Sequence, residues 1–182
     1  MLKKSLSLLL ALLVLVGALP AFAESEDASF GVFSAENLMP VPTEEEGDPA
    51  PITEAIFAEA ELTLVNYWET WCPPCIEELP ALGRLHEATE GRVQVVSVLL
   101  DSLDATGQRD ASAVETALLL METSGAEYPV LVPDTWLMMI ASYFITAIPT
   151  TFLVDGEGNV LGYVVGGRDE AGWLELIEEY LP

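Results

Sequence analysis

The stretch Leu62–Cys75, LTLVNYWETWCPPC, decides how this 182-residue chain is interpreted, because it holds the only two cysteines, Cys72 and Cys75. Its first half, Leu62–Trp68, has the composition of a strand that is covered on both faces. Pro73 suits the first position of a helix, with Cys72 as the capping residue. Two thiols at the junction of a strand and a helix predict an easily exchanged disulfide, and hence a dithiol–disulfide oxidoreductase.

Metal binding is the first alternative for a pair of cysteines two residues apart. A structural zinc site needs four ligands, and the only other soft ligand is His86, which we expect on a helix surface. A purely structural bridge is also disfavoured, because closing so short a loop removes little conformational entropy from the unfolded chain. We therefore expect no metal and no bound cofactor; the redox-active group would be the Cys72–Cys75 disulfide itself.

Residues 1–23 have the pattern of a secretory signal. Lys3 and Lys4 are the basic start, Leu6–Leu19 is the apolar stretch, and Ala21-Phe22-Ala23 is a small-x-small cleavage site. The apolar stretch is shorter than the roughly 20 residues of a spanning helix. We expect an exported protein, periplasmic or secreted, which an uncleaved signal would instead tether to the membrane.

Residues 24–50 begin acidic and end in a segment rich in proline and glutamate, which is typical of a linker. Within this linker, Phe30–Phe33 is a candidate edge strand. From about residue 51 the apolar pattern becomes regular, with no internal repeat and no second apolar core. We expect one domain over residues 51–182.

The charge balance is strongly acidic, with six Lys and Arg against 30 Asp and Glu. Both lysines lie in the predicted signal, which has no acidic residue, so its removal leaves four arginines against 30 carboxylates and a net charge of −26. Such a surface repels nucleic acids and anionic membranes. We expect neither of them as a partner.

The rest of the pattern predicts strands that alternate with helices. Residues 155–159 have the turn composition of a β-hairpin. The element order predicts an α/β fold whose central sheet is part parallel and part antiparallel, with helices on both faces. Strands are expected at Leu62–Trp68, Val93–Leu100, Tyr128–Val132, Thr150–Val154 and Val160–Val165, and helices from Pro73, at Asp110–Thr123 (with Val114, Leu118 and Met121 buried), at Thr135–Phe144 and from Asp169 to Leu181 (with Trp173, Leu174, Ile177 and Leu181 buried).

Cys72 is the candidate attacking thiol, because the N–H groups and dipole of a helix start stabilise a thiolate. Cys75, one turn further along, would resolve the mixed disulfide. Ile148-Pro149-Thr150 precedes a predicted strand, after the cysteine pair and before the hairpin. A cis peptide bond at Pro149 would leave backbone groups free to pair with an extended substrate chain.

Three carboxylates, Glu69, Glu77 and Glu78, crowd the dithiol in the sequence. Like charge disfavours a thiolate, so we expect a raised Cys72 pKa and a protein that acts as a reductant. Glu78 is a candidate buried proton acceptor, and an ordinary solvated carboxylate is the alternative. Trp71 would shape an apolar docking face.

Three stretches, in the same order along the chain, resemble the TlpA/ResA-like family of exported thiol-disulfide oxidoreductases: Val65–Cys75, Glu78–Leu82 and Ile148–Gly156. The resemblance covers residues 52–182. It implies a thioredoxin-like fold with a helical insertion before Tyr128, ahead of the cis-proline half.

The same resemblance implies roles for single residues: Cys72 as nucleophile, Cys75 as resolving cysteine, Pro149 as cis-proline and Glu78 as the acid near the site, with Trp71, Pro73 and Pro74 completing the active-site motif. It also implies partners. These are exported proteins with disulfides, apocytochrome c among them in cytochrome c biogenesis, and a membrane thiol donor.

Two departures from the family pattern leave the client and the donor open. Glu69 stands where relatives carry a small residue, and Ile76 stands where they carry a basic one, so the rim loses positive character. The alternatives are a net oxidant or isomerase and a non-catalytic module that uses the proline loop to hold extended peptides. A peroxidase is disfavoured, because peroxide reduction needs a stabilised thiolate.

Overall fold

The computed structural model describes residues 28–39, 50–89 and 91–181. The predicted signal, residues 1–23, and the proline-rich end of the predicted linker, residues 40–49, lie outside these described residues. Within the described ranges, no helix combines the length and the apolar character that crossing a membrane requires.

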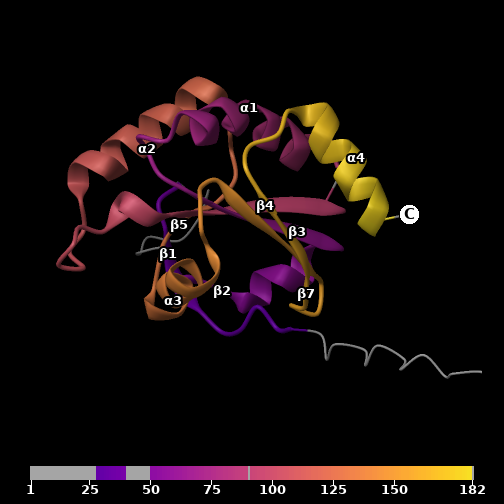
Figure 1. Ribbon diagram of the computed structural model, residues 1–182, viewed down its shortest axis with the longest axis horizontal. Helices are drawn as coiled ribbons and strands as arrows, with labels where there is room; N and C mark the ends of the chain where they lie inside the picture. The colour runs from indigo at the N-terminus through magenta and orange to yellow at the C-terminus, as the bar shows by residue number, and fades with distance from the viewer. Residues whose placement is uncertain (1–27, 40–49, 90, 182) are drawn as a thin grey trace, which may run out of the picture.

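A seven-stranded mixed sheet forms the centre of the molecule, in the order β2-β1-β5-β4-β3-β6-β7 (Figure 1). Parallel pairs join β3 to β4 and β4 to β5, whereas β6 runs antiparallel to both β3 and β7. The mixed sheet and the hairpin predicted from the sequence are confirmed. The strands are β1 (Ser34–Asn37), β2 (Ile52–Thr53), β3 (Leu62–Trp68), β4 (Val93–Leu99), β5 (Val130–Val132), β6 (Thr150–Asp155) and β7 (Val160–Val165).

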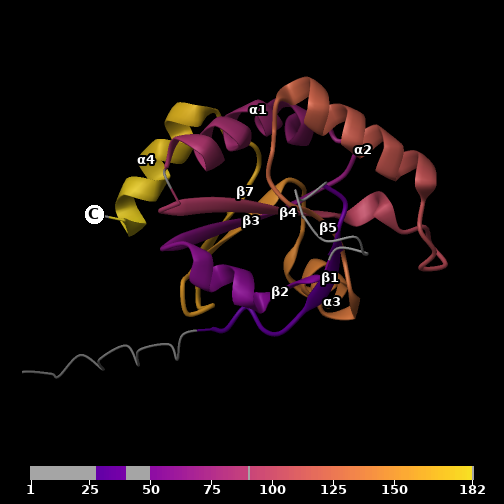
Figure 2. The same cartoon turned by 180° about the vertical axis from the view of Figure 1, so that it is seen from behind.

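Helices cover both faces of this sheet, as predicted (Figures 1 and 2). One face carries α1 (Pro73–Ala88), α2 (Ala111–Ser124) and α4 (Glu170–Tyr180). The opposite face carries α3 (Thr135–Phe144) and the short 3-10 helix η1 (Glu54–Glu59), while a second 3-10 helix, η2 (Leu100–Ser102), follows β4. Helix α2 lies between β4 and β5, where the helical insertion was expected.

The sheet separates two hydrophobic cores. The core under α1, α2 and α4 includes both cysteines and is called the disulfide-side core here. The core on the other face, the aromatic core, is built on Phe30, Phe33, Phe57, Tyr67 and Phe152, whose neighbouring rings meet edge to face at centroid distances of 5.4–6.2 Å. The apolar side chains of β3 enter both cores, which explains why they do not simply alternate with polar residues along the strand.

The N-terminal segment differs from the prediction. Phe30–Phe33, expected as an edge strand, is irregular, and β1 begins at Ser34 and lies inside the sheet between β2 and β5. Phe30 and Phe33 are buried because their rings pack against Phe57. Residues 28–39, expected within the linker, therefore fold as part of the domain.

The predicted buried faces of two helices are also wrong in part, although most predicted helix and strand bounds agree with the structure to within one or two residues. In α2, Ala117 and Met121 are buried, four residues apart, whereas Leu118 is 37% exposed. In α4, Trp173 is buried but Leu174 is 42% exposed. Both helices carry more apolar residues than the stripe that contacts the sheet can cover, so their composition does not define the buried face.

Candidate active site

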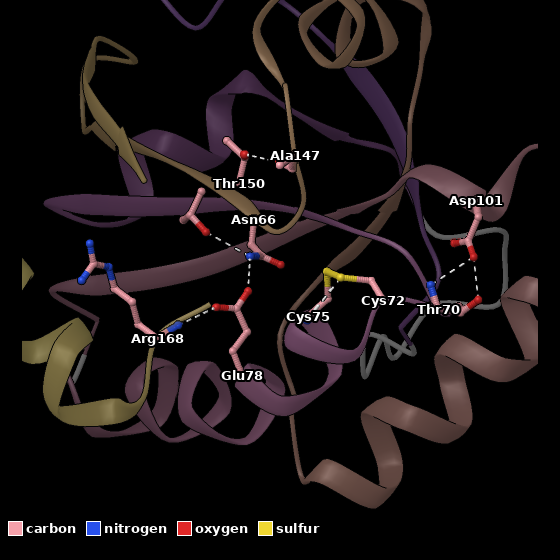
Figure 3. Close-up of a disulfide and its surroundings, with 10 residues drawn as sticks. Asn66, Thr70, Cys72, Cys75, Glu78, Asp101, Ala147, Thr150 and Arg168 are labelled. Carbon is pink, nitrogen blue, oxygen red and sulfur yellow. Dashed lines mark hydrogen bonds between the residues drawn. A yellow bond between two sulfur atoms is a disulfide. The ribbon is translucent and has the colours of Figure 1, made fainter. Parts of the chain in front are cut away.

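The disulfide lies at the start of α1, directly after β3 (Figure 3). Cys72 is the N-cap residue, with extended backbone, and its Sγ accepts a hydrogen bond from the Cys75 N–H at 3.3 Å. Pro73 and Pro74 open the helix without needing N–H partners. The strand–helix junction predicted for the cysteine pair is confirmed, and the Cys75 N–H together with the dipole of α1 favours negative charge on the Cys72 sulfur.

The two sulfurs are bonded, with the Cα atoms 5.3 Å apart, and they differ slightly in exposure. Cys72 is 3% exposed and Cys75 is 0% exposed, so both cysteines are buried and Cys72 is the slightly more exposed of the two. Trp71, beside Cys72, is 69% exposed, whereas Trp68 is part of the disulfide-side core. Of these two tryptophans, Trp71 is therefore the one that a docking partner could contact.

The loop before β6 lies at the end of the central strands from which the chain enters α1, where the disulfide also lies. The Ile148–Pro149 peptide bond is cis. Thr150 begins β6 opposite Tyr67, near the end of β3, and Ile148 packs against the core that includes both cysteines. The Pro149 carbonyl accepts the Gly166 N–H at 2.8 Å, but the Ile148 N–H and C=O have no hydrogen-bond partner among the described residues.

Glu78 is a buried carboxylate, only 3% exposed, on the sheet-facing side of α1. The side chain of Asn66 donates from Nδ2 to Oε1 at 2.8 Å, and the Arg168 backbone N–H donates to Oε2 at 3.3 Å (Figure 3). Burial raises the Glu78 pKa to about 7, although both hydrogen bonds favour the ionised form. The alternative of a solvated carboxylate is therefore wrong for Glu78, and its pKa suits proton exchange near neutral pH.

The other acidic residues lie at the rim. Glu77 is exposed. Glu69 is half-buried, and its pKa is raised by burial and by the nearby Asp101. Asp101 in turn accepts hydrogen bonds at Oδ2 from the Thr70 N–H at 3.0 Å and from the Thr70 hydroxyl at 2.5 Å. The rim around the disulfide is thus acidic, as the sequence indicated.

His86 is not the surface residue that was expected. It is half-buried on α1, and its Nδ1 accepts the Val95 N–H at 3.1 Å, which ties the helix to β4. Burial lowers the His86 pKa, in keeping with an unprotonated acceptor nitrogen. No cluster of three metal-ligating side chains occurs within residues 28–39, 50–89 and 91–181.

Sequence reasoning assigned no role to Asn66, Thr151 and Arg168, which complete the surroundings of Glu78. Asn66 Nδ2 also donates to Thr151 Oγ1 at 3.0 Å, joining β3 to β6. For Asn66 a signal existed, because a polar residue in a strand covered on both faces needs a buried partner. Thr151 and Arg168 gave no such signal, since only the fold brings them to α1.

A mixed sheet between two helical layers, a disulfide at the first helix after a central parallel strand and a cis-proline loop beside it define a thioredoxin-like fold of the thiol-disulfide oxidoreductase type. The chain belongs to the AhpC/TSA family, whose family model matches residues 39–162. The fold predicted from the resemblance is confirmed.

Named relatives support the same type. The chain is 28% identical over 124 residues to the thiol-disulfide oxidoreductase ResA of Halalkalibacterium halodurans, over 68% of this chain and 62% of that protein. It is equally identical to the thiol:disulfide interchange protein HelX of Rhodobacter capsulatus, over 68% of this chain and 63% of HelX. The match therefore spans less than two thirds of the length of these relatives.

A solved structure extends the similarity over most of the described chain. The crystal structure of a thiol:disulfide interchange protein of the thioredoxin family from Chlorobium tepidum superposes with a TM-score of 0.66 at 26% identity, covering 88% of this chain and 100% of that one. StoA from Bacillus subtilis, with a TM-score of 0.57 and 21% identity, covers 82% and 98% and shares the fold. The similarity to the TlpA/ResA-like proteins inferred from the sequence is thereby confirmed.

Proposed function

We propose that this protein is an exported thiol-disulfide oxidoreductase that reduces disulfides of client proteins. One observation carries the proposal: the Cys72–Cys75 disulfide caps α1 beside a cis-proline loop, and Cys72 is the slightly more exposed of the two cysteines. The unpaired backbone groups of Ile148 suit an extended client chain, which would pair with them as an added strand.

The exchange follows from the positions of the two sulfurs. The Cys72 thiolate attacks one sulfur of a client disulfide, forms a mixed disulfide and displaces the other client sulfur as a thiolate. Cys75 then gives its proton to Glu78, and its thiolate attacks the Cys72 sulfur. This step closes the Cys72–Cys75 bond and releases the second client sulfur, so the client gains two electrons and this protein is oxidised.

Two carboxylates near the disulfide, Glu69 at the rim and the buried Glu78, favour the reducing direction. Glu69 and Glu78 oppose negative charge on the cysteines of the open form, which stabilises the disulfide relative to a thiolate. A strong oxidant has the opposite property, with a potential of about −120 mV. We expect the reduction potential of the Cys72–Cys75 pair to be much more negative than that value. Equilibration of the protein with glutathione or a stronger reductant measures it. A potential near −120 mV would favour the alternative of a net oxidant or isomerase.

Catalysis is tested by insulin reduction with a matched pair of variants. Cys72→Ser should lose activity completely, because no attacking sulfur remains. Tyr143→Ser, an exposed position on α3, should keep it. A non-catalytic peptide-binding module would instead bind extended peptides equally well with and without Cys72, and wild-type protein would not reduce insulin.

Experiments on export and on the identity of the clients have to be done in the native host. The signal pattern of residues 1–23 supports export, and a mature N-terminus at Glu24 would establish cleavage. Cys75→Ser leaves the mixed disulfide on Cys72 unresolved, so it should accumulate client proteins in covalent complexes outside the cytoplasm. Recovery of an apocytochrome c would identify cytochrome c biogenesis as the pathway. Recovery of a membrane protein on the same Cys75→Ser bait, whose Cys72 thiolate attacks the disulfide of the oxidised donor, would identify the thiol donor.

A further inference from the structure

Asn66 has an unpaired oxygen in the most buried part of the site. Its side chain is fully buried, and Nδ2 donates to both Glu78 and Thr151. Oδ1 has no hydrogen-bond partner among the described residues. Leaving a buried carbonyl unpaired costs about 1–3 kcal/mol, so this oxygen calls for an explanation in another state of the site.

The direction of the unpaired oxygen supplies that explanation. In Figure 3 the Asn66 side chain lies between Glu78 and the disulfide, with its nitrogen directed to Glu78 and its oxygen on the side of Cys75. In the disulfide form, Cys75 has no proton to donate. When the disulfide opens, Cys75 becomes a fully buried thiol whose S–H needs an acceptor.

We propose that Asn66 is a positioning residue for thiol exchange: its NH2 group holds the Glu78 carboxylate, and its carbonyl oxygen accepts the hydrogen bond of the Cys75 thiol once the disulfide is open. This inference deepens the proposed function and rests on it. In the resolving step the proton leaves the Cys75 sulfur for the Glu78 carboxylate, the new sulfur–sulfur bond forms to Cys72, and the client thiolate departs. Asn66 gains and loses no proton.

Other groups around Glu78 set the background for this role. Thr151 Oγ1 on β6 accepts the second hydrogen bond of the same Asn66 NH2 group, and Arg168, in the loop before α4, supplies a backbone N–H and a positive charge to Glu78. Burial raises the pKa of the Tyr128 hydroxyl, ahead of β5, and the nearby Glu78 charge raises it further. Glu77 and Asp169 line the same pocket of about 250 Å³ as Glu78. Among these groups, Asn66 alone donates a side-chain hydrogen bond to Glu78.

The thiol contact is tested by NMR on two single-cysteine variants. Cys72→Ala keeps a free Cys75 thiol, whereas Cys75→Ala removes it. We expect the Asn66 side-chain 13Cγ signal of Cys72→Ala to match that of the reduced wild-type protein, and the signal of Cys75→Ala to match that of the oxidised protein. Identical Asn66 signals in the two variants would overturn the contact.

The hold on Glu78 is tested by the pH profile of exchange. Asn66→Leu removes the donor, so the pH midpoint should rise and the rate at pH 7 should fall about fivefold, with recovery at pH 9. Gln94→Leu is the matched control, because Gln94 is also a buried amide with two hydrogen bonds but lies on the aromatic-core side of the sheet. The pH profile of this variant should match that of the wild type. An unchanged midpoint in Asn66→Leu contradicts the proposal.

The two levels of inference fail separately. If wild-type protein reduces no disulfide, the proposed function is wrong, while the NMR comparison still reports on the Asn66–Cys75 contact. If wild-type protein is active but Asn66→Leu keeps its pH profile, only the role of Asn66 is wrong.

Discussion

The aromatic core and the disulfide-side core are buried to the same extent, and they differ in how completely their polar groups are paired. In the aromatic core the Tyr67 hydroxyl donates to the Leu137 carbonyl, and Trp136 Nε1 donates to the Phe30 carbonyl. Gln94 donates from Nε2 to the Ile56 carbonyl and to Thr63. In the disulfide-side core, four buried polar atoms have no partner among the described residues: Asn66 Oδ1, Trp68 Nε1, Tyr128 OH and Trp173 Nε1.

This difference separates the part of the molecule that stabilises the fold from the part that performs chemistry. Paired groups and interlocked rings hold one arrangement, since any change leaves a buried polar group without a partner. Unpaired groups cost stability in the disulfide form. We propose a use for one of them, Asn66 Oδ1, which would accept a hydrogen bond from the Cys75 thiol when the disulfide opens.

The largest expected effect is on the aromatic core. Phe57→Ala removes a ring that packs against Phe30 and Phe33, so the free energy of unfolding in urea should fall by about 3–5 kcal/mol. The reduction potential should not change, because the disulfide lies on the opposite face. Tyr143→Ala, at a residue 78% exposed, should stay within about 0.5 kcal/mol of wild type. A shifted potential in Phe57→Ala would show that the two cores are not separate.

The second effect is the pH dependence that Glu78 imposes. Its folded-state pKa of about 7 lies above the ordinary value of 4.5, so the folded protein keeps a proton that the unfolded chain releases. This proton binding stabilises the folded protein in full below about pH 4.5, and the stabilisation is lost as the pH rises through 7. The loss in the free energy of unfolding is about 3 kcal/mol.

Glu78→Gln removes this loss. The difference in free energy of unfolding between the variant and wild type should therefore be about 3 kcal/mol more favourable to the variant at pH 8.5 than at pH 4. Urea titrations at the two pH values measure it. A difference that is the same at both pH values would mean that Glu78 ionises normally in the folded protein.

A matched pair of tyrosines compares the two cores directly. Tyr128→Phe removes a buried hydroxyl that has no partner in the part of the chain that the structure describes, so stability should be unchanged or should rise by up to about 1 kcal/mol. Tyr67→Phe removes a hydroxyl that donates to the Leu137 carbonyl at 3.5 Å, and stability should fall by about 0.5–1 kcal/mol. Thermal and urea unfolding of both variants measure the contrast, and equal losses would remove it.

The smallest effect concerns Arg168. Three of the four arginines form ion pairs with glutamates, and within the described ranges Arg168 forms none. Arg168→Gln keeps the backbone N–H but removes a charge that lowers the Glu78 pKa, so a 13C NMR titration should show that pKa move upward. Arg84→Gln, which breaks an exposed pair with Glu170, should leave it in place. A downward shift in Arg168→Gln would contradict the electrostatic account.

Much of the fold was accessible from the sequence because its signals are local. The run of β3, the proline-led start of α1 and the full extent of α3 were predicted correctly. The errors have tertiary causes. β1 is short and is held in the sheet by pairing with β2 and β5, and Leu118 is exposed because the contact with the sheet is narrower than the apolar face of α2.

The site divides in the same way. Cys72, Cys75 and the proline loop are recognisable because spacing along the chain defines them. The state of Glu78 was left open, because its burial depends on Gly167, Arg168 and Asn66, which reach it from other parts of the chain.

The order of residues alone determined that a strand delivers two sulfurs to the first turn of a helix and that a proline precedes the partner strand, since these features depend on neighbours in the chain. Only the tertiary structure decided which carboxylate is buried, what pKa it has and which polar atoms remain unpaired. Those properties arise from burial in a region of low dielectric constant and from contacts between α1, β3, β6 and the loop before α4. They cannot be predicted from the spacing of residues along the sequence, because the fold alone brings these segments together.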